Sequence, residues 1–249
     1  MSKPTIPIDF YLEAASVFHW ATKRHYQLWF TGQARTRHRR TESVLRRLTK
    51  SGKLRAVYYG KKLIYSIPRI SKGTKNDEFS GLSKVVHGLA CTECLVRFFR
   101  SRTDGTVIAE CYFSGLGAVP EWGIVYPNGN MLLFEFCTKH NFFFSGNVQG
   151  KLSAYRQNLE KIEDKFNAKA MVVFVIDVPR ITLEKYIISR AYAGSASAEG
   201  DTFPFNPFFF TDYETFLNVP IGQALYEPIY IWSDGKNYPL TNNVRSENH

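Results

Sequence analysis

A tight turn between two apolar runs is the feature that most constrains the fold of this chain. The turn Pro127-Asn128-Gly129-Asn130 separates the runs Trp122–Tyr126 and Met131–Thr138. Asparagine and glycine both tolerate a positive φ, and Asn-Gly between apolar runs is the strongest short-range signal for a β-hairpin. We therefore expect two antiparallel strands joined at this turn.

Two carboxylates belong to this hairpin. Glu121 opens the first strand, and Glu135 lies within the apolar run of the second, where alternation places residues 135, 137 and 139 on one face. An unpaired carboxylate is costly to bury, so Glu135 should have a metal ion, a cation or a hydrogen-bond donor beside it. Two acids on neighbouring strands with a lysine close by are the minimum of a divalent-metal nuclease site. The alternative is a pair of solvated or salt-bridged structural glutamates.

The charge of the chain is unevenly distributed. Residues 1–77 carry 17 Lys and Arg against 4 Asp and Glu, whereas the remainder carries 15 against 18 and the whole chain has a net charge of +10. A basic first third on a slightly acidic body predicts that one domain binds a polyanion, with nucleic acid as the leading partner. A basic helix that binds a protein partner is the alternative.

Composition places the chain among ordinary globular proteins, with 44% hydrophobic and 22% charged residues. No run approaches the roughly 18 apolar residues of a membrane span, and the N-terminal residues lack the apolar core of a signal peptide. Four cysteines do not make a disulfide scaffold in a chain of 249 residues. Cys91 and Cys94 have zinc-ligand spacing but no second pair, which favours buried thiols. We expect a cytoplasmic protein with no membrane partner.

Apolar periodicity predicts three helices at Ile8–Trp20, Thr22–Phe30 and Thr36–Ser51, followed by two strands within Leu54–Ile67. Three helices and a basic hairpin, with the pattern Val44–Leu54 leading into it, resemble a winged helix-turn-helix. The resemblance implies that the third helix enters the major groove of double-stranded DNA and that the wing meets phosphates or the minor groove. B-form DNA suits a groove-reading helix better than RNA does. The residues expected to contact DNA are Arg37, Arg39, Arg40, Ser43, Arg46, Arg47 and Lys50 on the helix and Lys61 and Lys62 at the wing tip.

The rest of the chain is expected to read helix, three strands, helix, strand. The expected elements are a helix at Phe79–Arg102, a strand at Val107–Phe113, the hairpin, a helix at Asn147–Asn167 and a strand at Ala170–Asp177. Beyond them we expect a helix at Pro179–Ala191, an aromatic segment at Thr202–Phe210 that covers the core or forms an oligomer contact, and a short strand at Ile229–Trp232. The domains are then residues 1–70, a polar linker at 71–77, and residues 78–249.

This αβββαβ order, with Pro120-Glu121 and Glu135 on its second and third strands, resembles the PD-(D/E)XK nuclease superfamily. The whole chain resembles the replication-relaxation family of mobile-element and plasmid proteins, in which a winged helix-turn-helix precedes such a core. The matching segments are His87–Arg97, Val119–Val125, Phe134–Thr138 and Lys151–Tyr155. The fold class expected from the resemblance is α+β or α/β: an N-terminal winged helix-turn-helix, a nuclease-like core and a C-terminal extension.

The resemblance also implies a chemistry. Glu121 and Glu135 would hold Mg²⁺, with Mn²⁺ as a substitute, and Glu93 could add a third carboxylate. Cys137 stands at the usual lysine position, so Lys139 or Lys151 would have to supply the cation. One hypothesis is therefore a Mg²⁺-dependent endonuclease that acts in the replication, transposition or maintenance of a mobile element. The others are a DNA-binding replication or maintenance protein, and a regulator whose core serves dimerisation. The resemblance also implies a prokaryotic, phage or plasmid origin, and the expected protein partners are a second copy of the chain and other mobile-element proteins.

Overall fold

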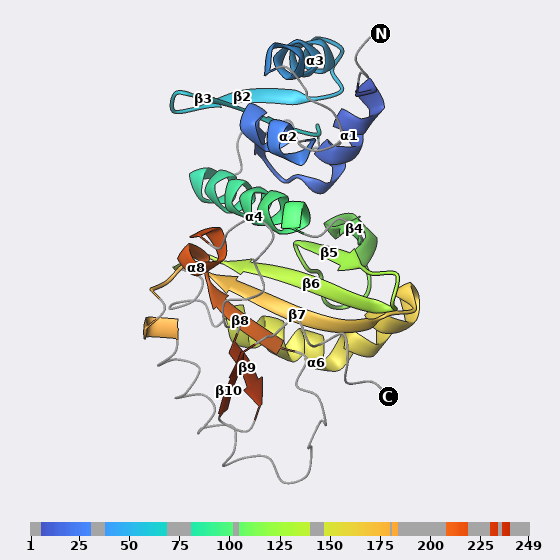
Figure 1. The fold of residues 1–249 in the computed structure, drawn as a ribbon, viewed down its shortest axis with the longest axis vertical. Helices are drawn as coiled ribbons and strands as arrows, with labels where there is room; N and C mark the ends of the chain where they lie inside the picture. Colours follow the sequence, from blue (N-terminus) through green and yellow to red (C-terminus); the bar gives the residue numbers. More distant parts are fainter. Residues whose placement is uncertain are drawn as a thin grey trace. The chain divides into compact units, whose positions relative to one another are not determined.

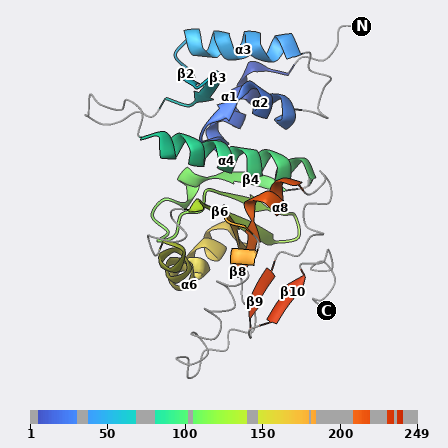
Figure 2. The same cartoon turned by 90° about the vertical axis from the view of Figure 1, so that its left-hand side faces the viewer.

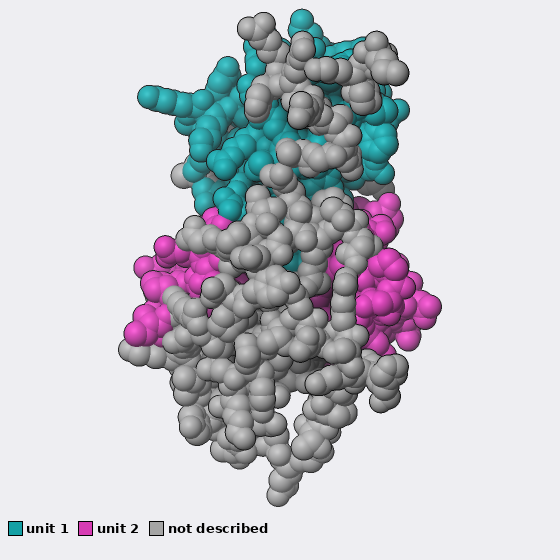
Figure 3. Space-filling view, viewed as in Figure 1, with its two compact units in different colours: residues 1–100 teal, residues 101–249 magenta. Residues whose placement is uncertain are grey.

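The computed structural model describes residues 6–30, 38–68, 81–101, 105–139, 147–179, 181–183, 208–218, 230–233 and 236–239. The chain forms two compact units, Met1–Arg100 and Ser101–His249, which are coloured separately in Figure 3. The expected linker at 71–77 lies outside the described residues, and the helix that follows it groups with the first unit instead of the second. Both units mix helices and strands, so the expected mixed class of α and β structure is confirmed.

The first unit contains three helices, a β-hairpin, a short additional strand and a final long helix (Figure 1). In chain order these are α1 (Ile8–Val17), β1 (Ala21–Thr22), α2 (Lys23–Trp29), α3 (His38–Lys50), β2 (Arg55–Tyr59), β3 (Lys62–Ser66) and α4 (Gly81–Ser101). The predicted helices and hairpin are confirmed, although α1 ends at Val17 and not at Trp20. The sequence did not reveal β1, which pairs antiparallel with β3 and completes a sheet of order β1-β3-β2.

Helix α3 buries one face and exposes the other. Thr41, Leu45 and Leu48 are almost completely buried, at the i, i+4 and i+7 spacing of one helix face. Val44, beside this buried face, is only partly buried. The helix ends at Lys50, and Gly52 in the turn that follows has a φ of 70°, which favours glycine. The Lys53 N–H donates back to the Leu48 carbonyl at 3.0 Å.

The second unit is built on a seven-stranded mixed sheet of order β10-β9-β8-β7-β6-β5-β4. Its elements are β4 (Thr106–Ala109), a 3₁₀ turn η1 (Glu110–Phe113), β5 (Trp122–Val125), β6 (Asn130–Cys137), α6 (Asn147–Phe166), β7 (Lys169–Ile176), β8 (Phe208–Asp212), α8 (Tyr213–Asn218), β9 (Tyr230–Ser233) and β10 (Lys236–Pro239). Strands β6, β7 and β8 are parallel, and every other neighbouring pair is antiparallel.

Several expected elements of this unit change in the structure. The strand expected over Val107–Phe113 is wrong in its second half, where the chain turns into η1. The end of the aromatic segment is the fully buried strand β8, and β10 was not expected at all. Of the helix expected at Pro179–Ala191 only residues 181–183 are described as helical, and residues 241–249 lie outside the described residues.

The hairpin has the predicted form. Trp122 pairs with Phe134 and Val125 with Met131, and the turn residue Gly129 has a φ of 78°. The Tyr126 N–H donates to the Asn130 carbonyl at 2.8 Å, which closes the turn. The rings of Trp122 and Phe134 stack with centroids 3.7 Å apart, so cross-strand packing adds to the hydrogen-bonded pairing.

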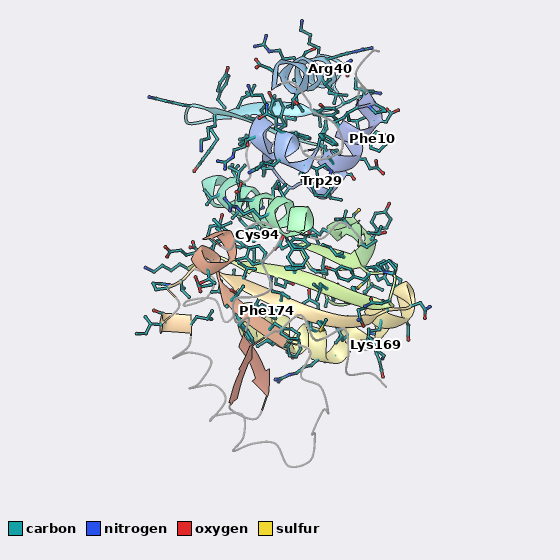
Figure 4. All side chains as sticks on the ribbon, in the orientation of Figure 1. Phe10, Trp29, Arg40, Cys94, Lys169 and Phe174 are labelled. Atoms are coloured by element: carbon teal, nitrogen blue, oxygen red, sulfur yellow. The ribbon has the colours of Figure 1, made fainter. Side chains whose placement is uncertain are left out.

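Helices cover both faces of this sheet, and Figure 2 shows α6 and α8 from a second direction. On one face, Leu133 of β6 packs in a common core with Leu152 and Ile162 of α6 and with Phe174 of β7, which is labelled in Figure 4. On the other face, Phe134 contacts Phe216 of α8. Because side chains alternate along β6, Glu135 falls on the face that α6 covers. None of the described helices combines the length and apolar character that crossing a membrane requires.

Candidate functional site

Glu135 is the centre of a buried polar cluster in the second unit. Its side chain is 1% exposed, and the Lys151 ammonium of α6 contacts its Oε2 atom. The Tyr155 hydroxyl donates to its Oε1 atom at 2.8 Å. Lys151 and Tyr155 are four residues apart, so they lie one above the other on the helix face that packs on β6. The partner that burial of Glu135 demands is therefore a cation together with a hydroxyl donor.

Glu121 joins the same cluster. The Lys151 Nζ atom lies 3.7 Å from Glu121 Oε1, and the Glu121 side chain is 13% exposed. The backbone N–H of Glu121 donates to the Phe134 carbonyl at 2.9 Å. Continuing the register of Trp122 with Phe134 by one residue places Glu121 beside Glu135, on the same face of the sheet. One ammonium group thus contacts carboxylates from two neighbouring strands.

Burial controls the ionisation of this cluster. It raises the pKa of Glu135 to about 7, an effect that Lys151 opposes and the nearby charge of Glu121 increases. Burial alone would lower the pKa of Lys151, but the two carboxylates raise this pKa well above its usual range. Burial and Glu135 likewise raise the pKa of Tyr155 far above its ordinary value. Lys151 therefore remains a cation and Tyr155 a donor at neutral pH, and Glu135 is the group that titrates.

The structure distinguishes between the two lysines proposed to replace the cation missing at position 137. Lys139 is exposed and lies beyond the end of β6 at Cys137, whereas Lys151 contacts both acids. Cys137 itself is completely buried, and burial raises the pKa of its thiol to about 12. This side chain therefore supplies neither a charge nor a thiolate at neutral pH.

Glu93, the expected third carboxylate, lies on α4 in the first unit. Its Oε2 atom is 2.8 Å from Nε2 of His25, and its Oε1 atom accepts a hydrogen bond from Arg97 at 2.7 Å. The His25 Nδ1 atom accepts the Thr22 backbone N–H, so the Nε2–H is the group that donates to Glu93. The hydrogen bond from His25, opposed by burial and supported by Arg97, lowers the pKa of Glu93 to about 2. Both oxygens of Glu93 are thus used within the first unit, where the carboxylate links α2 to α4.

Tyr155 is a site residue that we did not expect from the sequence. The signal was present in the spacing of Lys151 and Tyr155, which puts both side chains on one face of α6. Only the observed packing of α6 on β6 shows that this face meets Glu135.

The second candidate surface is the outer face of α3. Its exposed side chains are those of Arg40, Ser43, Arg46, Arg47 and Lys50. Figure 4 labels Arg40 on α3. An open hollow on this surface is lined by Glu42, Ser43, Arg46, Arg47 and Lys50. Arg37 lies outside the described residues, and the side chain of Arg39 is not described.

The β2–β3 hairpin also exposes cations. Lys61 and Lys62 are exposed at its turn, where Gly60 has a φ of 56°. Tyr58 on β2 is 73% exposed, which is unusual for so large a ring.

The two surfaces differ in chemistry, since one is a buried acid–lysine cluster and the other an exposed cationic helix. No protein-family model and no curated protein matches the chain, so the family stays a resemblance carried by its sequence motifs.

Proposed function

We propose that the protein binds double-stranded DNA through its first unit and serves the replication or maintenance of a mobile element or plasmid. The order helix, strand, helix, helix, strand, strand and the sheet order β1-β3-β2 support a winged helix-turn-helix. In this proposal α3 is the groove-reading helix and the β2–β3 hairpin is the wing. The observation that carries the proposal is the exposed cationic face of α3.

The charges on this face suit a polyanion. Arg47 and Lys50 are exposed and have no carboxylate partner in the part of the chain that the structure describes. Each cation that neutralises a phosphate releases condensed counterions. The logarithm of the binding constant therefore falls with the logarithm of the salt concentration, with a slope of about 0.9 per contact. A face that only keeps the protein soluble would not produce such a slope.

The test is fluorescence anisotropy with a 30-base-pair duplex at a series of salt concentrations. Arg47→Ala and Lys50→Ala should each weaken binding and reduce the salt slope by about 0.9. Lys161→Ala, which removes an exposed lysine from α6 in the second unit, is the matched control and should change neither. Absence of duplex binding by the wild type, or unchanged slopes in both α3 variants, contradicts the proposal.

A second candidate function is Mg²⁺-dependent DNA cleavage, and the contact of Lys151 with both Glu121 and Glu135 favours it. The strands β4 to β7, the helix α6 and the two acids support a PD-(D/E)XK-like core for the second unit. The donors fit in type, because Mg²⁺ prefers carboxylate oxygens and a cation already lies against both groups. Glu121 and Glu135 would hold the ion, and the Lys151 ammonium would have to give up its place between them. A bound Mg²⁺ supplies charge stabilisation at the scissile phosphate and a more acidic water.

Two measurements test this candidate. Supercoiled plasmid should be nicked with Mg²⁺ or Mn²⁺ by the wild type and by the control Glu160→Gln, an exposed acid on α6, but not by Glu135→Ala. Isothermal titration with Mn²⁺ should show binding that Glu121→Gln removes.

A wild type that neither binds Mn²⁺ nor cleaves DNA contradicts the nuclease. The core then fits the alternative of a non-catalytic dimerisation body, for which light scattering should give twice the mass of the chain.

A further inference from the structure

Helix α3 carries a single acid among its basic residues. Glu42 lies at the margin between the buried and the exposed faces, and its side chain is 39% exposed. Its Oε2 atom accepts a hydrogen bond from Lys23 of α2 at 3.1 Å, and its Oε1 atom accepts one from Arg46 at 2.7 Å. The carboxylate thus connects the body of the unit to an arginine that is 71% exposed.

Stability does not account for this acid. Ion pairs between exposed side chains contribute little to folding, because solvent screens them and two long side chains must be ordered. Hydrogen bonds and charge from Lys23, together with the charge of Arg46, lower the pKa of Glu42, so it is ionised at neutral pH. On a face that approaches phosphates, a fixed negative charge weakens binding to every DNA sequence.

The geometry points to a compensating role: we propose that Glu42 is a positioning residue that holds the Arg46 guanidinium for reading a base edge. This inference rests on the proposed DNA binding. Glu42 engages only the Nη2 side of the guanidinium, and arginine has five N–H donors in a rigid fork. The remaining donors suit the O6 and N7 acceptors of guanine in the major groove. Without Glu42, Arg46 is free to contact phosphates, which carry no sequence information.

The position of Arg46 agrees with this role. Arg46 lines the same hollow as Ser43, Arg47 and Lys50, on the face opposite the buried residues of α3. Lys23 donates a hydrogen bond to the second oxygen of Glu42, and this bond restricts the rotamers of the carboxylate. Lys23 thus orients the Glu42 carboxylate, and the carboxylate in turn orients the Arg46 guanidinium.

The experiment begins with selection of duplexes from a randomised 20-base-pair pool by the full-length wild type. Affinities for a selected duplex and for a random-sequence duplex are then measured for the wild type, Glu42→Gln, Arg46→Ala and the double variant. Glu13→Gln, which makes the same charge change at an exposed position of α1, is the control. Thermal unfolding of each variant confirms that the unit is folded.

Glu42→Gln should bind the random duplex more tightly, by about eightfold at 0.1 M salt if the released cation makes one new phosphate contact with a slope increment of about 0.9. Its preference for the selected duplex should fall as far as that of Arg46→Ala, and the double variant should lose no more than either single variant. Glu13→Gln should keep the wild-type preference.

A Glu42→Gln variant that keeps the full preference overturns the inference, and so does a double variant whose losses add. A wild type that binds all duplexes equally overturns the inference but leaves DNA binding intact. A wild type that binds no duplex removes the proposed function itself.

Discussion

Removing Lys151 tests the buried cluster most directly. In Lys151→Met the side chain keeps its approximate size but loses its charge, so Glu135 remains 1% exposed with the Tyr155 hydroxyl as its described donor. Removal of one partner from a buried ion pair costs about 3–5 kcal/mol, because the other charge stays buried without compensation. We expect a loss of this size in the free energy of unfolding of the second unit at pH 8.5.

The loss should depend on pH in a defined direction. Burial raises the pKa of Glu135 from 4.5 to about 7, so the folded chain binds this proton more tightly than the unfolded chain. The resulting stabilisation is complete below pH 4.5 and is lost as pH rises through about 7. Without Lys151 the pKa of Glu135 rises further, and at pH 5 the carboxyl is neutral in both proteins. At this pH, Lys151→Met should lower the free energy of unfolding by only about 1–2 kcal/mol, through the lost hydrogen bond and packing.

The assay is a urea titration in which unfolding is monitored by pulsed hydrogen exchange. The readout is the exchange of peptides from β6 and β7, because these peptides report on the second unit alone. The double variant Glu135→Gln/Lys151→Met should be more stable at pH 8.5 than Lys151→Met, since no charge is left buried. Equal losses at pH 5 and pH 8.5, or a double variant less stable than the single one, would refute the reasoning.

Three further predictions concern the first unit. Gly52→Ala should lower its free energy of unfolding by about 1 kcal/mol in urea titration, because φ is 70° at this position. Hydrogen bonding to His25 lowers the pKa of Glu93 from 4.5 to about 2, so its stabilisation is present above pH 4.5 and is lost as pH falls toward 2. Glu93→Gln should therefore destabilise the unit at pH 7 and much less at pH 2.5, as circular dichroism can measure. Tyr58→Ala should weaken duplex binding with an unchanged salt slope, whereas Lys61→Ala should reduce the slope by about 0.9.

Local signals in the sequence were sufficient for the elements that depend on neighbouring residues. The Asn128-Gly129 turn and its flanking apolar runs predicted the hairpin, and with it the placement of Glu121 and Glu135 on neighbouring strands; the register that sets the two acids beside each other comes from the structure. The end of α3 shortly before Gly52 was also predictable, because a left-handed residue after a helix favours glycine.

Elements that depend on distant partners were not readable in this way. Strand β8 was not predicted, because Pro204 and Pro207 precede it in the sequence and argue against a strand there. The strand pairs in parallel with β7 and is buried on both faces, so its sequence shows no polar–apolar alternation. The two-residue strand β1 exists only because β3 pairs with it. The contact of Lys151 with both acids depends on how α6 packs on β6, and the position of Lys139 depends on where β6 ends. The alternation of residues along a strand predicts neither.

The parallel pairing of β7 with β8 has a consequence during synthesis. Residues 177–207 separate the two strands in the sequence, so β7 emerges from the ribosome well before Phe208–Asp212 can cover its edge. Until then the nascent chain displays an apolar strand edge, Val172–Ile176, of the kind that recruits chaperones or pairs with other chains. A stop codon or a proteolytic cut ahead of residue 208 should therefore yield aggregates of the second unit, not a shorter folded version of it.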